Sequence, residues 1–320
     1  MIVMSIKNKL RKIKNNPIGL YVWNEYRRIL GKRSIKKYSD LKFIDKLYLQ
    51  TTGHKVNWNN PQRLTEKMQW LKLFYRNSLM PICSDKYTVR SYLVERGYEN
   101  LLNEIHGVYD DPKDIDLNKL PDKFVLKGTA GSGWNLICHD KNAINWYWWK
   151  KIMNSWLKQD LYIYGREWNY KQLNGKILVE KYLEDDSGEL RDYKLFCFNG
   201  NPQFMQVDES RFSDHKRVYV KESGEVIKVQ DGVHGLDTFK MDKIHHKLFK
   251  IARDLSRDFP FVRVDFYICN NKIYFGELTF FDGSGFYNLD PDAIDFEWGQ
   301  YLTLPEPNYN IELLKELQDD

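Results

Sequence analysis

The feature that most constrains the fold is a series of short β-rich segments in the second half of the chain. They are residues 176–183, 192–200, 202–210, 216–220, 261–270 and 271–280. Glycine, Asn-Gly and Asn-Asn turns separate several of these segments, and such turns join antiparallel strands. Helical patterns occupy residues 61–76, 86–95, 143–158 and 242–258. This order predicts an α+β fold with a mainly antiparallel sheet, rather than a Rossmann fold or a TIM barrel.

Length and composition are those of a soluble globular protein. The chain has 320 residues, which suggests about two domains at roughly 150 residues per domain. Its 42% hydrophobic and 29% charged residues exclude collagen and low-complexity disorder. No apolar run approaches the ~18 residues of a membrane span, and the first residues lack the hydrophobic region of a signal peptide. The four cysteines form no Cys-x-x-Cys pair, so we expect buried reduced thiols, no zinc site and a cytoplasmic protein.

Positive charge is concentrated at the N-terminus. Residues 1–40 contain eleven lysines and arginines and two acids, a net charge of +9, whereas the whole chain carries +5. This predicts an anionic neighbour: a lipid headgroup surface, a nucleic acid or an anionic substrate. The apolar residues among these charges suit an interfacial helix; they are Ile13, Ile18, Leu20, Tyr21 and Trp23. The alternative is an amphipathic helix that covers the body of the protein. We predict no nucleic-acid partner, because no zinc-finger spacing or RNP motif accompanies the charge.

The segment Lys127-Gly-Thr-Ala-Gly-Ser-Gly133 follows a short apolar strand. Its glycines would let backbone N–H groups approach phosphate oxygens, and the lysine adds positive charge beside them. The lysine precedes the glycines, unlike that of a Walker A loop, and the pattern is not G-x-G-x-x-G. The segment is a candidate phosphate-binding loop, with an ordinary surface turn as the alternative.

Two carboxylates lie on neighbouring strands late in the chain. Asp265 and Glu277 are nearly equidistant from the expected hairpin turn Asn270-Asn271, so they should face each other across the strands. Facing carboxylates repel unless a cation lies between them, and Mg²⁺ prefers oxygen ligands of this kind. Arg263 should point to the same face as Asp265 and could hold a phosphoryl group. The alternative is a structural salt-bridge cluster.

A further candidate segment, Glu180-Lys181-Tyr182-Leu183, follows the apolar residues 176–179. An acid and exposed backbone groups at the end of a strand could meet the adenine and ribose of a nucleotide. An ordinary strand end is the alternative.

Taken together, these segments resemble the ATP-grasp superfamily, and most of all its TupA-like branch, found in bacterial surface-polysaccharide and teichuronopeptide biosynthesis. The resemblance covers roughly residues 40–300 and rests on RLTEKMQWLKLFYRN, SDKYTVRSYL, GREWNYKQLNGKILVEKYLE and DYKLFCFNGNPQF. It implies two α+β lobes, with mainly antiparallel sheet, that hold ATP between them. The expected divisions are a basic helical N-terminal segment (1–80), the ATP-grasp domain (81–305) and a C-terminal helix or tail (306–320).

The resemblance implies a site for ATP and Mg²⁺. At the phosphates of ATP it places Lys86, Lys127 and, near the terminal phosphate, Lys194, with Gly131, Ser132 and Gly133 in the loop that closes over them. At the adenine it places Glu180, which meets the amino group, and the backbone of Lys181 and Leu183. At the ribose it places Glu184. The residues it assigns to the chemistry are Arg263, Lys194 and Lys127 as catalytic residues, and Asp265, Glu277 and Thr279 as metal ligands. Many members have asparagine where this chain has Thr279, a weaker ligand, which leaves open whether one or two Mg²⁺ bind.

The implied reaction is ATP-dependent amide formation. ATP phosphorylates a carboxylate, and an amine then displaces phosphate from the acyl phosphate. The implied partners are a small-molecule amine and a carboxylated glycan, with a uronic acid as the expected carboxylate, or its lipid-linked precursor.

Candidates for binding the substrates are Arg211 and His215, for an acidic acceptor, and Ser284, in a turn that resembles an acyl-phosphate or acceptor site. A loop without a role is the alternative for Arg211 and His215. Residues 1–40 would hold the enzyme at the inner face of the membrane.

Two rival functions follow from the same setting. A glycosyltransferase would use an Asp-x-Asp pair to hold a metal–diphosphate, and Asp290-Pro-Asp292 and Asp114-Ile-Asp116 are formal matches. Both lie in acidic, turn-like segments rather than at the end of an apolar strand. A catalytically inactive nucleotide-binding module is the other rival. An inactive module would not need all five charged residues of the expected site, and this chain has them: Lys86, Lys127, Arg263, Asp265 and Glu277.

Overall fold

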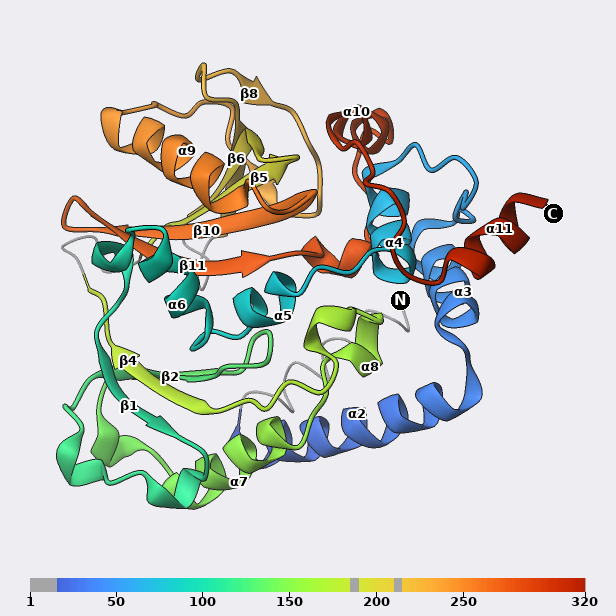
Figure 1. The fold of residues 1–320 in the computed structure, drawn as a ribbon. Coiled ribbons are helices and arrows are strands. Elements are labelled where there is room, and N and C mark those ends of the chain that lie inside the picture. Colours follow the sequence, from blue (N-terminus) through green and yellow to red (C-terminus); the bar gives the residue numbers. More distant parts are fainter. Residues whose placement is uncertain (1–15, 185–189, 210–214, 320) are drawn as a thin grey trace. The chain divides into compact units, whose positions relative to one another are not determined.

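A computed structural model describes residues 16–184, 190–209 and 215–319, which fold into two compact units (Figure 1). The first unit contains residues 16–39, 85–87 and 103–182, and the second contains the other described residues. Residues 1–80, expected as one segment, are therefore shared: residues 16–39 belong to the first unit and residues 40–84 to the second.

A four-stranded sheet forms the centre of the first unit. Its strands are β1 (Ile105–Tyr109), β2 (Phe124–Gly128), β3 (Asn135–Cys138) and β4 (Ile177–Lys181). They pair antiparallel in the order β1-β4-β2-β3. The helices are α2 (Pro17–Lys37), α7 (Trp146–Leu157) and α8 (Tyr162–Gly165), with 3₁₀ turns at Pro112–Asp114, Leu117–Lys119, Lys141–Ala143 and Trp168–Tyr170.

The core of this unit lies between α7 and the sheet. Ile152, Met153 and Trp156 of α7 are buried in one apolar cluster with residues of β2, β3 and β4. Trp156 stacks on Trp134, with ring centroids 6.4 Å apart. The tryptophan-rich helix is therefore a core element, as its helical spacing indicates.

One face of α2 packs on α7 and α8 (Figure 1). Asn24 donates a hydrogen bond from Nδ2 to Ser155 Oγ (3.3 Å). Gly31 lets the helix approach α8 closely, because a Cβ there would lie 2.4 Å from Ile163 Cδ1. The expected basic helix is thus present, and this face covers part of the first unit.

The second unit contains a seven-stranded sheet. Its strands are β5 (Asp192–Phe198), β6 (Asn201–Glu209), β7 (Lys216–Val220), β8 (Val226–Ile227), β9 (His234–Gly235), β10 (Phe261–Cys269) and β11 (Lys272–Thr279). Their order is β11-β10-β5-β6-β7-β8, all antiparallel, with β9 parallel to β7. The helices are α3 (Asp40–Thr52), α4 (Leu64–Phe74), α5 (Leu79–Ser84), α6 (Val89–Glu95), α9 (Lys243–Ser256), α10 (Ala293–Tyr301) and α11 (Ile311–Asp319), with a 3₁₀ turn at Glu99–Leu101.

The two faces of the large sheet are covered differently. α9 packs on one face, where the ring centroids of His245 and Tyr193 lie 5.3 Å apart. Neighbouring residues of a strand point to opposite faces, so Lys194 points to the other face. There Trp298 of α10 stacks on Phe204 at 4.3 Å, which covers only part of that face with aromatic rings. The remainder is polar and carries the candidate site.

The β10–β11 hairpin confirms that the two predicted acids face each other. Asp265 pairs directly with Glu277 across the two strands, because a bulge between Asp265 and Phe266 shifts the register that the turn alone would set. Asn270 and Asn271 form the turn with φ of 50° and 60°, the left-handed conformation that a two-residue hairpin favours and that asparagine tolerates.

The helix expected at residues 86–95 begins later, at Val89. Asp85 accepts a hydrogen bond from the N–H of Tyr87 (2.8 Å), and the N–H of Lys86 donates to the carbonyl of Thr129 (3.1 Å). Asp85 therefore forms an Asx turn and does not cap a helix that starts at Lys86, because residues 85–87 join the first unit.

Candidate active site

A row of polar residues crosses one face of the large sheet. Glu277 pairs with Asp265, Asp265 with Lys194, and Lys194 with Gln206. Gln206 in turn pairs with Tyr219. Residues that pair directly across strands point to the same face, so these five side chains lie in one line. The sequence predicted only the first three members of this row.

Arg263 binds the acids at one end of the row. Its guanidinium donates to both carboxylate oxygens of Asp265 (2.7 and 2.6 Å), to Glu277 Oε1 (3.3 Å) and to Asp282. It also donates to Thr279 Oγ1 (3.2 Å), and that hydroxyl donates to Glu277 Oε1 (3.0 Å). The structure thus brings together the arginine and the three predicted metal ligands, and it also shows the salt-bridge cluster that was the alternative.

This cluster has more negative than positive groups. Three carboxylates surround one guanidinium, and burial raises the pKa of Asp265 to about 6 although Arg263 lowers it. Glu277 keeps about a third of its side chain exposed (34%). Within residues 16–184, 190–209 and 215–319, no group of three or more His, Cys, Asp and Glu side chains is arranged to hold a metal. Mg²⁺ is often bound by one or two carboxylates plus substrate phosphates, and Asp265, Glu277 and Thr279 fit that pattern.

Asp208 anchors a second group of charges beside the row. Its side chain is fully buried and accepts hydrogen bonds from Lys194, from Arg217 Nε (2.6 Å) and from Gln206 Nε2 (2.8 Å). His215 Nε2 lies 2.9 Å from Asp208 Oδ1, the oxygen that Arg217 contacts, whereas Lys194 and Gln206 donate to Oδ2. Burial opposes ionisation, but Lys194 and Arg217 outweigh it and hold the pKa of Asp208 well below its ordinary value.

The sequence analysis missed Asp208 and Arg217. The available signal was the alternation Gln206, Val207, Asp208, which places two polar residues on one face of an otherwise apolar strand. His215, a predicted acceptor residue, lies in this network. Arg211, the other one, lies outside the described residues.

A left-handed turn contains the predicted substrate residue Ser284. Gly283, Ser284 and Gly285 have φ of 50°, 58° and 61°. Lys72 of α4, almost fully buried, donates from Nζ to the carbonyl (2.6 Å) and hydroxyl (3.2 Å) of Ser284. Gln69 donates to the carbonyl of Gly285 (2.9 Å). The turn is thus held from α4, by two residues that sequence analysis assigned to a helix without a role.

The phosphate-binding candidates of the first unit also meet. Lys86 donates from Nζ to the carbonyl of Gly131 (2.7 Å), so it is held against the glycine-rich loop. Lys127 donates from Nζ to Glu180 Oε2 (2.7 Å). Three segments distant in the sequence, predicted to contact ATP, therefore converge in this unit, with Ser132 and Gly133 at the exposed tip of the loop.

The remaining nucleotide candidates are less favourably placed. The N–H of Lys181 already donates to the carbonyl of Glu104 (2.9 Å), and its carbonyl accepts from Asn103 Nδ2 (2.8 Å). Leu183 and Glu184 belong to the second unit, where the Glu184 carbonyl accepts from Cys269 Sγ (3.4 Å). A contact between adenine and the Lys181 amide would have to replace the bond to Glu104.

Gly131 is sterically required in the loop. A Cβ at this position would lie 2.0 Å from Trp134 Cε3, whereas one at Gly133 would meet nothing within 4 Å. We expect Gly131→Ala to lower the free energy of unfolding by about 1–3 kcal/mol through overpacking. Gly133 has a φ of 69°, so Gly133→Ala should lower the free energy of unfolding only through backbone strain, by about 1–2 kcal/mol, and should leave Trp134 in place. Thermal denaturation followed by tryptophan fluorescence distinguishes them, and an unchanged fluorescence spectrum for Gly131→Ala would contradict the steric argument.

Residues 66–303 match the family model described as TupA-like ATPgrasp, a span of well over half the chain. The chain belongs to the TupA-like ATP-grasp family. Membership of this family confirms the expected α+β ATP-grasp fold and ATP as the nucleotide, and it makes the protein an ATP-dependent ligase that forms carbon–nitrogen bonds.

Solved structures of ATP-grasp ligases are similar at low identity. D-alanine–D-alanine ligase from Bacillus anthracis is 13% identical over 79% of this chain and 70% of its own, with a TM-score of 0.41. Phosphoribosylamine–glycine ligase from Thermotoga maritima is 12% identical over 72% of this chain and 58% of its own, with a TM-score of 0.39. Such values carry no argument about substrates. No curated protein matches the sequence.

The Asp-x-Asp pairs of the rival glycosyltransferase are engaged in other contacts in this ATP-grasp protein. Asp292 pairs with Arg63, which donates to both of its carboxylate oxygens. Asp116 accepts a hydrogen bond from the N–H of Asn118 (3.0 Å) and so closes a local turn. Neither pair lies at the end of an apolar strand.

Proposed function

We propose that this ligase joins an amine to the carboxylate of a uronic acid in a bacterial surface polysaccharide or its lipid-linked precursor. The observation that carries the proposal is the convergence of Arg263, Asp265, Glu277 and Lys194 on one sheet face, in a chain of the TupA-like family. It supplies both charges that phosphoryl transfer needs, cations for the phosphoryl oxygens and carboxylates for Mg²⁺.

The proposed reaction has two steps. A carboxylate oxygen attacks the γ-phosphorus of ATP, the bond to the β-phosphate oxygen breaks, and ADP leaves with an acyl phosphate formed. The amine nitrogen then attacks the acyl carbon, and the carbon–oxygen bond to phosphate breaks. The amine loses a proton, and an amide and inorganic phosphate are released. Arg263 and Lys194 would bind the oxygens of the transferring group. Bound Mg²⁺, held by Asp265, Glu277 and Thr279, would neutralise phosphate charge.

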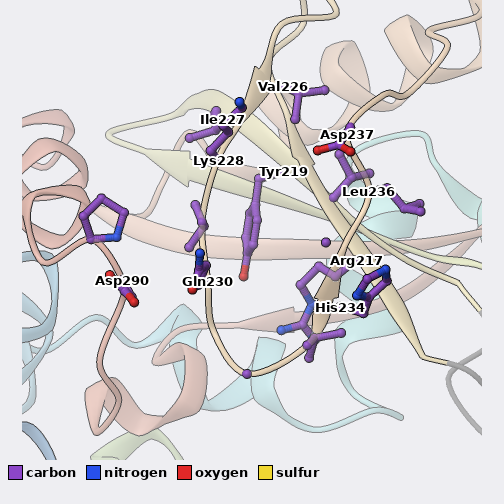
Figure 2. A pocket seen from close by; sticks show the side chains of 16 residues that line it. Arg217, Tyr219, Val226, Ile227, Lys228, Gln230, His234, Leu236, Asp237 and Asp290 are labelled. Carbon is purple, nitrogen blue, oxygen red and sulfur yellow. The ribbon is translucent and has the colours of Figure 1, made fainter.

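A pocket beside the polar row is the proposed site for the acceptor. It has a volume of about 470 Å³, within the usual range for small-ligand sites, and is lined by β7, by residues 226–237 and by Asp290-Pro291 (Figure 2). Arg217 and Tyr219 form part of its wall, and both donate to Asp231. Asp265 and Tyr219 are three strand spacings apart, about 14 Å at ~4.8 Å per step. An acceptor that fills the pocket and reaches the acids must be larger than one sugar ring.

The hydroxyl of Tyr287, a residue that does not line this pocket, is buried and has no hydrogen-bond partner among the residues that the structure describes. Burial raises its pKa well above the ordinary value, and Asp282, Asp295 and Tyr219 add to this effect.

Phosphate release and product mass test the proposed activity. We expect release from ATP and Mg²⁺ only when a uronate-containing oligosaccharide and an amine are both present, with a product mass equal to acid plus amine minus water. Glu277→Gln should reduce the rate at least about 100-fold, because a metal ligand is lost from the transition state. Glu312→Gln on α11, an exposed acid, is the matched control.

Ligand-induced stabilisation provides a second readout. ATP with Mg²⁺ at about 100 times Kd should stabilise the wild type by ~2.7 kcal/mol and the Glu277→Gln variant by less. Stabilisation by a UDP-sugar, with none by ATP, would refute the ligase and favour the glycosyltransferase.

A further inference from the structure

The face of α2 opposite α7 is apolar and exposed. Ile18, Val22, Tyr26 and Ile29 follow one another at steps of four, four and three, so they lie on one side of the helix. Together with Leu30 they form the exposed stripe, whose side chains are 42–56% exposed. Soluble monomers rarely expose a contiguous apolar patch of this kind unless it binds something.

The charges around the stripe are almost all positive. α2 carries six lysines and arginines, and its single acid, Glu25, pairs with Arg28 at 2.6 Å. Four of the cations lie in the last two turns at Lys32, Arg33, Lys36 and Lys37, and all four are exposed. Long basic side chains can extend away from an apolar surface to reach headgroup phosphates.

We propose that the exposed stripe of α2 lies in the interface of an anionic lipid bilayer, with the cations at its C-terminal end on the headgroups. No helix among the described residues is long and apolar enough to cross a membrane, and α2 would lie parallel to the surface. The sequence offered a membrane helix and a covering helix as alternatives. The structure shows one face of α2 covering the first unit and a separate face free to insert.

A second copy of the chain fits this face poorly. An isologous dimer through α2 would bring together two helices that each carry a net charge of +5. The first fifteen residues are also a poor cover for it, since they add five cations and no acid. An anionic membrane surface complements the positive charge of α2 and of the first fifteen residues, and it can also take up the apolar side chains of the exposed stripe.

Sedimentation with vesicles tests the proposal on the full chain. The probes are vesicles of phosphatidylglycerol mixed with phosphatidylcholine, and vesicles of phosphatidylcholine alone. We expect binding to the anionic vesicles only, reduced at least about tenfold in Ile18→Gln/Val22→Gln/Tyr26→Gln/Ile29→Gln and in Lys32→Gln/Arg33→Gln/Lys36→Gln/Lys37→Gln. Glutamine keeps the helix propensity high, and thermal denaturation checks that each variant folds.

The matched control replaces exposed apolar residues of the second unit, Leu49, Val94 and Ile311, with glutamine. It should bind vesicles as the wild type does. Equal binding of the stripe variant and the control would overturn the proposal, as would no binding of the wild type to anionic vesicles. A wild-type dimer that becomes monomeric in the stripe variant would also overturn it, in favour of a second copy. None of these outcomes depends on the ligase activity, so this proposal and the proposed function fail separately.

Discussion

Replacing Arg263 with methionine is expected to abolish amide formation and to lower the free energy of unfolding by about 3–5 kcal/mol. The guanidinium is the cation that contacts Asp265, Glu277 and Asp282 together. When the guanidinium is removed, three carboxylates lie close together without a cation between them. A buried charge without an opposite charge lowers the free energy of unfolding. Chemical denaturation with a fluorescence readout measures the stability, and phosphate release measures the activity.

Two further variants separate the role of Arg263 in stability from its role in catalysis. Arg253→Met removes an exposed arginine that lies 3.4 Å from Glu222 at the surface, and should change stability by about 1 kcal/mol or less. Arg263→Lys keeps the charge but loses the planar fork that binds both oxygens of Asp265. We expect it to fold better than Arg263→Met and still to lose most activity. An Arg263→Met protein as stable as Arg253→Met would contradict the buried-charge argument.

Replacing Asp208 with asparagine is expected to be comparably destabilising, by about 3–5 kcal/mol at neutral pH. Its carboxylate is fully buried and is the shared acceptor of Lys194 and Arg217. The variant leaves these two cations side by side without the charge between them. The exposed pair Lys315–Glu312 gives the control, since Glu312→Gln should cost less than about 0.5 kcal/mol.

The pH dependence of the stability difference between the wild type and Asp208→Asn is a second check. Lys194 and Arg217 depress the pKa of Asp208 in the folded state, so its contribution to stability is fully present above the unfolded pKa of about 3.9. The contribution is lost as the pH falls below that value towards the folded pKa. The stability curves of the wild type and Asp208→Asn should therefore run parallel from pH 7 to about 5 and converge below about 4. Curves that converge already near pH 6 would show that another group is responsible.

The hairpin that carries the acids could be predicted from the sequence, except for its bulge, because its turn and strands are local features. The Asn270-Asn271 turn fixes the register, and the two-residue period of the strands fixes the faces. Counted strictly from the turn, Asp265 would lie opposite Gly276, but a bulge between Asp265 and Phe266 shifts the register by one residue and pairs Asp265 with Glu277. The family resemblance supplied the identity of the nucleotide and the reaction class, which no local pattern contained.

The residues that were missed depend on tertiary contacts. Lys72 is read as a polar position of an amphipathic helix, yet it is almost fully buried because the left-handed turn at Ser284 folds over it. Asp208 lies on β6, which pairs with the strand of Lys194, and Arg217 lies on β7, which pairs with β6; neither pairing could be read from one strand alone. The expected start of a helix at Lys86 was wrong for the same reason, since a hydrogen bond to distant Thr129 competes with the first turn, and the helix begins at Val89.

The placement of the acceptor pocket has a consequence for how such an enzyme can diversify. The proposed chemical groups lie on β5, β10 and β11, whereas much of the pocket wall comes from residues 226–237 and from Asp290-Pro291. Strand positions tolerate little change, because each backbone group is committed to the sheet, but residues 228–233, which connect the two-residue strands β8 and β9, can accept insertions and substitutions. Exchanging residues 226–237 between homologues should therefore alter which glycan is accepted while the reaction stays the same, which makes this segment the natural target for libraries that seek new acceptors.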